Sequence, residues 1–243
     1  MLQAILFGVT ASSALVIGGV AGAYWRPPAA VTHILLAFAS GALISALAFE
    51  LFEEAHALGG TARSGLGLLA GAAAFIGANV LLDQRVAKPQ DMGDSPARSG
   101  SARTLGLALL AGALLDGIPE NAALGVMLVE NSSVALLVAI FVANVPEAMV
   151  GAVAMRAGGR SPRFIVGIWA LAALILAAAV VIGRVALGGA GPAALSILLA
   201  FAGGAVLAAL ADTVMPQAFE RGRPWYAFAT AAGFFLSFLL SSE

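Results

Sequence analysis

The 243-residue sequence contains no cysteine, and only 10% of its residues are charged. Without cysteine the chain can form neither disulfide bonds nor thiolate metal sites. A soluble domain carries about 25% charged residues, so the low charge content excludes an ordinary water-soluble fold and a disordered chain. The formal net charge is −1, so the chain lacks the excess of basic residues that is typical of nucleic-acid-binding proteins. We therefore expect no nucleic-acid partner.

What the sequence does contain is apolar residues, which make up 61% of the chain, and 29 glycines. Small residues let membrane helices approach closely, and each crossing needs about 20 apolar residues. We therefore predict an all-α polytopic membrane protein, a single domain over residues 1–243, with eight transmembrane helices. The eight apolar stretches cover residues 2–24, 32–57, 65–82, 104–129, 133–155, 163–185, 192–219 and 225–241.

The basic residues are distributed unevenly between the two sides of the predicted bundle. Ten of the 12 lysines and arginines lie at the loops after the first, third, fifth and seventh stretches, whereas Arg63 and Arg184 lie on the opposite side. The positive-inside rule then predicts a multi-pass protein of the cell membrane with both termini outside. The longest connector, residues 83–103, is rich in Pro, Ser, Gly and charged residues, which predicts a flexible cytoplasmic loop.

Two of the stretches contain similar sequences. Residues 38–43 (FASGAL) align without gaps with residues 201–206 (FAGGAV), at an offset of 163 residues. Chance similarity in a chain rich in Ala and Leu is the alternative explanation. Because the two stretches would cross in opposite directions, we predict that spans one to three and six to eight form an inverted repeat around a central pair, spans four and five.

Spans four and five carry polar residues near their middle. Asp116 and Glu120 are four residues apart, Asn144 and Glu147 are three apart, and a proline directly precedes each glutamate. These spacings put each pair on one helical face, and each proline frees a backbone carbonyl group. A carboxylate deep in a bilayer costs from about 3 to more than 10 kcal/mol, so such groups are usually functional. The pattern favours a divalent-cation site over a packing role for these polar residues.

Other polar residues allow more than one interpretation. Asp212 in span seven is either a further member of the cation site or a packing partner. His33 and His56 lie near the ends of span two, where an interfacial position is favoured over metal ligation. Three glutamates at the outer end of span two form either a solvated helix end or an acidic vestibule that attracts cations: Glu50, Glu53 and Glu54.

The paired Pro-Glu motifs resemble those of the ZIP (Zrt-/Irt-like protein) family of divalent metal transporters. The resemblance extends to eight spans, external termini and a variable loop after span three, and it implies metal ligands at Asp116, Glu120, Asn144 and Glu147. Asp116 stands where the family commonly has histidine, and span six has no interior carboxylate for the family's second metal position. The chain is therefore similar to a divergent, bacterial-type member with one oxygen-dominated site.

We therefore expect a carrier that moves zinc or another first-row metal such as iron or manganese into the cytoplasm by alternating access. Its partners would be divalent metal ions and the lipid bilayer, with a homodimer as a further option. The metal is the substrate, and we expect no permanently bound cofactor. Carriage of a different ion or solute on a ZIP-like scaffold is the main alternative. A receptor or an intramembrane enzyme is a third hypothesis, but the hydrolase motifs His-Glu-x-x-His and Gly-x-Ser-x-Gly are both missing, so we expect no enzyme.

Overall fold

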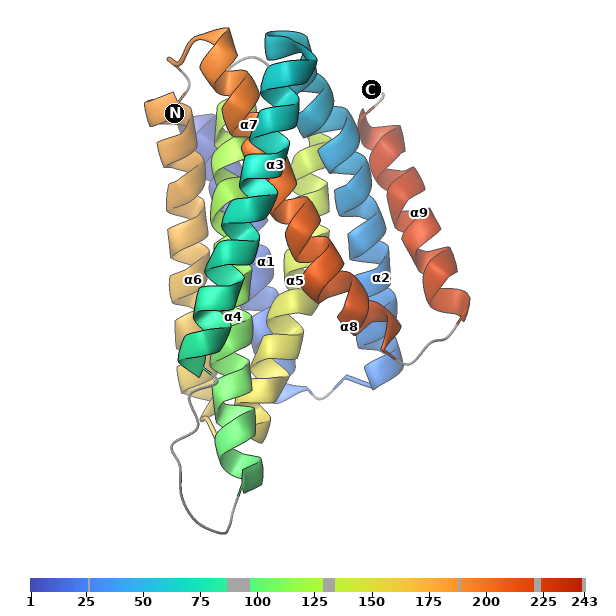
Figure 1. Ribbon diagram of the computed structural model, residues 1–243. Coiled ribbons are helices and arrows are strands. Elements are labelled where there is room, and N and C mark those ends of the chain that lie inside the picture. The colour runs from blue at the N-terminus through green and yellow to red at the C-terminus, as the bar shows by residue number, and fades with distance from the viewer. Residues whose placement is uncertain (26, 87–96, 129–133, 188, 221–223, 242–243) are drawn as a thin grey trace.

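The computed structural model describes residues 1–25, 27–86, 97–128, 134–187, 189–220 and 224–241. Over these residues the regular secondary structure is helical, without strands, which confirms the all-α prediction (Figure 1). The helices are α1 (Leu2–Tyr24), α2 (Ala29–Ala46), η1 (Leu47–Phe52), α3 (Glu53–Val86), α4 (Ala97–Met127), α5 (Val134–Ala157), α6 (Pro162–Ile182), η2 (Gly183–Leu187), α7 (Pro192–Ala209), η3 (Leu210–Val214), α8 (Met215–Phe219) and α9 (Pro224–Ser241). The three η segments are π-helical.

Among the described residues, seven helical segments are long and apolar enough to cross a membrane. This agrees with a multi-pass membrane protein. One of these segments, Ala29–Leu81, contains 53 residues. It is broken at Gly60, whose φ of 70° and ψ of 176° lie outside the helical region and suit a residue without a Cβ atom. The part of α3 after this break runs in the opposite direction to α2 (Figure 1).

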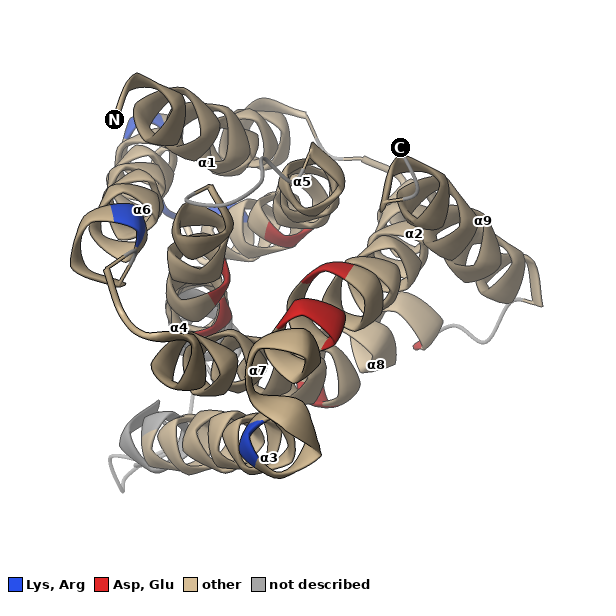
Figure 2. Ribbon diagram, turned by 90° about the horizontal axis from the view of Figure 1, so that it is seen from above, with Lys and Arg blue, Asp and Glu red and all other residues tan. Residues whose placement is uncertain are grey.

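The helices pack in two groups. The first contains α1, α4, α5 and α6, in which α1 packs on α5 and α6, and α4 packs on the same two helices. The second contains α2 packed on α9, and α3 packed on α7. The groups meet where α5 packs on α2 and α4 packs on α7. Figure 2 shows that the acidic parts of α4 and α5 lie on the sides turned toward α2 and α7.

Helices α2 and α9 approach each other closely at two glycines. A Cβ atom on Gly41 would overlap the carbonyl oxygen of Thr230 on α9, and one on Gly233 would overlap the carbonyl oxygen of Phe38 on α2. Each helix therefore presents a glycine to a main-chain carbonyl of the other. A larger side chain at either glycine would push the two helices apart.

Helices α3 and α7 make the same reciprocal contact. A Cβ atom on Gly204 would overlap the carbonyl oxygen of Leu68, and one on Gly71 would overlap the carbonyl oxygen of Phe201. On α7, Phe201 and Gly204 follow the corresponding residues of α2 by 163 positions, the offset of the sequence similarity. On α3, Leu68 and Gly71 precede their counterparts on α9 by 162 positions.

The π-helical segments η1 and η3 begin at corresponding positions. Leu47 begins η1 directly after α2, and Leu210 begins η3 directly after α7. These two residues are 163 positions apart. Both segments continue the helices that face α4 and α5. This position is of interest because π-helical turns are rare and often occur at functional sites.

The predicted loop over residues 83–103 is helical at both ends. Helix α3 continues to Val86, and α4 begins at Ala97. Residues 87–96, which form the middle of this connector, lie outside the described part of the chain.

Candidate cation site

The candidate site is built on two helices that each contain a proline. Helix α4 continues through Pro119, and α5 continues through Pro146. Proline has no backbone N–H, so the carbonyl group four residues earlier loses its usual helical donor. In the same turn of α4, the side-chain amide of Asn121 donates a 2.8 Å hydrogen bond to the carbonyl oxygen of Gly117. This bond goes to Gly117 and not to Leu115, the residue four positions before Pro119.

Four of the predicted site residues line one small cavity. Asp116 and Glu120 of α4, together with Asn144 and Glu147 of α5, surround a volume of about 10 Å³. The remaining wall is apolar and comes mainly from α2, α7 and η3: Leu43, Ala143, Val206, Leu210 and Val214. A volume of this size is close to the minimum that holds one water molecule. The space therefore fits a single ion or water, and it is too small for an organic solute.

The polar groups at this cavity are deeply buried. Glu120 is 4% exposed and Asn144 is 2% exposed, while Asp116 and Glu147 are partly buried. Three of their buried atoms have no hydrogen-bond partner: Oδ1 of Asp116, Oε1 of Glu120 and Nδ2 of Asn144. Buried polar atoms in native proteins are nearly always paired, so the two carboxylate oxygens are free to accept from a donor or a cation, and the amide nitrogen is free to donate.

The carboxylates do not form a complete metal coordination sphere. Within the described ranges, no three His, Cys, Asp or Glu side chains are grouped closely enough to hold a metal ion. Because the cavity has room for a single ion or water, a divalent cation there would need a rotation of side chains to complete its coordination.

Two larger cavities continue from the small one toward one end of the bundle. A cavity of about 200 Å³ shares Asp116, Glu147 and Val214 with the small cavity. A third cavity, of about 380 Å³, shares four residues with the second: Leu36, Leu105, Leu109 and Gln217. Its wall also includes Pro27 at the start of α2 and Glu220 after α8. These helix ends lie at the end of the bundle for which the sequence predicts most of the basic residues.

Apolar side chains of several helices pack together beyond the site. Leu47 and Leu51 of η1 belong to one buried cluster with Leu124 of α4, Leu136 of α5 and Leu199 of α7. Each of these five leucines is at most 6% exposed.

Asp212 is not among the residues that line the small cavity. It lies on η3 and is exposed, and its Oδ2 accepts a 2.6 Å hydrogen bond from Nδ2 of Asn79 on α3. The structure therefore brings together Asp116, Glu120, Asn144 and Glu147, and it gives Asp212 a separate partner.

The other polar residues of span two differ in exposure. His56 and Glu53 are exposed, and Glu50 is half-buried. His33, in contrast, is buried and lines the 380 Å³ cavity.

Gln217 is a cavity residue that the sequence pattern does not single out. It lines both the 200 Å³ and the 380 Å³ cavities. The useful signal was its position directly after Pro216, because Glu120 and Glu147 also follow a proline within a span. Asn79 and Thr213 line the 200 Å³ cavity as well, and they carry no comparable signal.

Comparison with known proteins gives no assignment. No protein-family model matches the sequence. No curated protein is significantly similar to it.

Proposed function

We propose that the protein is a carrier for a divalent metal cation. The observation that carries the proposal is the convergence of Asp116, Glu120, Asn144 and Glu147 on one cavity of about 10 Å³ within an apolar bundle. Carboxylates in this setting are costly, and a cation would provide the opposite charge that their buried, unpaired oxygens lack. The two Pro-Glu helices also resemble the ZIP family, in which zinc, iron or manganese is the substrate.

The proposed arrangement has eight spans. A straight helix as long as Ala29–Leu81 would extend about 80 Å, whereas the apolar core of a bilayer is about 30 Å thick. The break at Gly60 and the reversal of direction after it support two crossings by this segment. With eight spans, both termini lie on the side with few basic residues, which the positive-inside rule assigns to the outside of the cell membrane.

We further propose that the two ends of the chain are inverted repeats. Three observations support this: the sequence similarity at an offset of 163 residues, the reciprocal glycine contacts of α2 with α9 and α7 with α3, and the matched starts of η1 and η3. Inverted repeats are a frequent basis of alternating access in secondary transporters. The row of cavities that begins at Asp116 and Glu147 would connect the site to one end of the bundle.

The proposal is tested by metal uptake into liposomes that contain the purified protein and a trapped fluorescent indicator. Glu120→Gln and Glu147→Gln should each nearly abolish Zn²⁺ and Mn²⁺ uptake, because each removes an anionic oxygen from the cavity. Glu53→Gln is the matched control, since Glu53 is exposed and should tolerate the change. Uptake at the wild-type rate by the Glu120→Gln, Glu147→Gln double variant would show that the proposed function is wrong.

Carriage of a different ion or solute is the second candidate. It is favoured by one observation, that no three His, Cys, Asp or Glu side chains in the described ranges are grouped as a metal site. The same liposomes separate the two candidates. A Glu120-dependent flux of protons or Na⁺ that no divalent metal competes with would support this alternative.

A further inference from the structure

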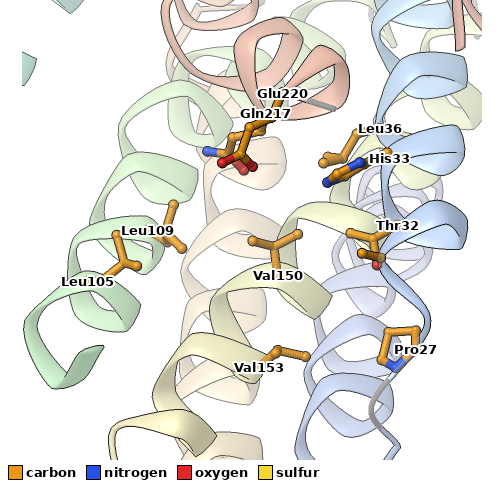
Figure 3. Close-up of a pocket in the computed structure, with 11 residues that line it drawn as sticks. Pro27, Thr32, His33, Leu36, Leu105, Leu109, Val150, Val153, Gln217 and Glu220 are labelled. Atoms are coloured by element: carbon orange, nitrogen blue, oxygen red, sulfur yellow. The ribbon is translucent and has the colours of Figure 1, made fainter. Parts of the chain in front are cut away.

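The 380 Å³ cavity has a polar end that the central site does not use. Its volume is about 380 Å³, and most of its wall is apolar. The exceptions at one end are His33 of α2, Gln217 of α8 and Glu220 directly after α8. Figure 3 shows the side chains of Gln217 and Glu220 close together, with the ring of His33 directed toward them from the opposite wall.

His33 is buried in a way that favours a ligand. It is 8% exposed, and its Nδ1 atom has no hydrogen-bond partner. The ring is held in place by an edge-on contact with Tyr226, with ring centroids 5.7 Å apart and planes at 85°. The imidazole ring lines the cavity, and imidazole is the commonest metal ligand among side chains.

The opposite wall supplies oxygen donors. Gln217 and Glu220 are three residues apart, the spacing at which side chains on a helix are neighbours. Glu220 is exposed, so its negative charge remains solvated at little cost. The cavity therefore places one nitrogen donor opposite one carboxylate and one amide oxygen.

We propose that His33, Gln217 and Glu220 form a second, weaker site for a divalent metal ion on the basic side of the bundle. The inference rests on the proposed function, because the shared lining residues Leu36, Leu109 and Gln217 connect this cavity to the one below the central carboxylates. Two strong ligands and one amide leave room for water in the coordination sphere. A metal ion held in this way dissociates readily, as a site on a release path requires.

The nitrogen donor also gives this site a different preference from the central one. Imidazole suits Zn²⁺, Co²⁺ and Ni²⁺, whereas Mg²⁺, Ca²⁺ and Mn²⁺ prefer carboxylate, carbonyl and water oxygens. The two sites together would therefore favour first-row metals that accept both donor types.

The experiment uses Co²⁺ as a probe of the purified full-length protein in detergent. Binding is measured by equilibrium dialysis, and histidine ligation by the protection of each histidine from diethylpyrocarbonate, read by mass spectrometry. The chain has two histidines, so the exposed His56 is an internal control for His33. All measurements are repeated in the Glu120→Gln, Glu147→Gln background, in which two of the three central carboxylates are removed.

We expect Co²⁺ to protect His33 and not His56 in both backgrounds. His33→Ala and Glu220→Gln should each weaken the Co²⁺ binding that remains in the Glu120→Gln, Glu147→Gln background by roughly tenfold, which corresponds to about 1.4 kcal/mol. His56→Ala should leave it unchanged. Because Glu220 is exposed, Glu220→Gln keeps the test valid if loss of the buried His33 ring impairs folding.

Two outcomes would overturn the proposal. One is equal reactivity of His33 with and without Co²⁺, and the other is Co²⁺ binding by Glu220→Gln that equals binding by His56→Ala. These results are independent of transport. If metal uptake in liposomes fails while Co²⁺ protects His33, the proposed function is wrong and the second site is supported. If metal uptake occurs while Co²⁺ does not protect His33, the carrier function is supported and the second site is wrong.

Discussion

The side-chain amide of Asn79 on α3 donates a 2.6 Å hydrogen bond to the carboxylate of Asp212 on η3. Both residues lie within segments that are apolar enough to cross a membrane, and a bond of this kind gives the carboxylate a partner where water is scarce. The sequence leaves Asp212 open as a site member or a packing partner. The bond gives Asp212 a packing partner, and membership of the cation site stays a prediction.

The first prediction concerns this pair. Asp212→Asn can still accept the hydrogen bond through its amide oxygen, so metal uptake should remain within about threefold of the wild-type rate. A threefold change corresponds to a free-energy difference of less than about 1 kcal/mol. Asp212→Leu removes the bond and leaves Asn79 unpaired in the membrane, which should lower the thermal stability of the detergent-solubilised protein. Loss of uptake in Asp212→Asn, comparable to Glu120→Gln, would make Asp212 part of the cation site.

The second prediction concerns metal preference. Asp116→His replaces a carboxylate of the small cavity with imidazole, which should shift preference from Mn²⁺ toward Zn²⁺. The ratio of Zn²⁺ to Mn²⁺ competition in one uptake assay should change by several-fold, because one ligand exchange is worth on the order of 1 kcal/mol and about 1.4 kcal/mol is tenfold. An unchanged ratio with intact transport would mean that Asp116 does not contact the metal.

The third prediction concerns packing. Gly41→Ala places a methyl group against the main-chain carbonyl of Thr230, and the resulting shift of α9 should cost about 1–3 kcal/mol. Over most of this range the cost exceeds the roughly 1 kcal/mol by which alanine favours a helix over glycine. Gly77→Ala is the matched control, because no atom lies within 4 Å of its Cβ position. Thermal unfolding in detergent should show a lower midpoint for Gly41→Ala and an unchanged or higher one for Gly77→Ala.

The fourth prediction concerns orientation in the membrane. Because the chain has no cysteine, single cysteines can be labelled without a background. Ala157→Cys at the end of α5 should react with a membrane-impermeant thiol reagent from the cytoplasmic side, and Gly189→Cys between η2 and α7 from the outside. Both positions are exposed. The opposite labelling pattern would contradict the positive-inside argument.

The sequence predicted where the helices lie in the chain better than it predicted which residues pack against one another. Long apolar stretches specify α1, α5 and α9 almost to the residue, because each crossing needs a minimum apolar length. The grouping of Asp116 with Glu120 and of Asn144 with Glu147 follows from helical spacing alone, and both pairs line the same cavity.

Tertiary packing accounts for what the sequence did not predict. The burial of His33 depends on Tyr226, which is almost 200 positions away in the chain. The separation of Asp212 from the small cavity depends on Asn79, on a helix that is distant in sequence. The π-helical form of η1 and η3 has no reliable local signal, since it arises where one extra residue is accommodated within a packed helix.

The contact of α2 with α9 has a consequence for the order in which the chain can assemble. Helix α2 ends at Ala46, and α9 ends at Ser241. At a synthesis rate of about 5–20 residues per second, α9 is completed on the order of 10–40 seconds after α2 leaves the ribosome. During this interval the Gly41 surface of α2 has no native helix to pack against. The contacts of Gly41 and of the Phe38 carbonyl group can form only after α9 has been inserted. A ribosome-bound chain that lacks α9 should therefore be far more sensitive to protease than the chain that contains it.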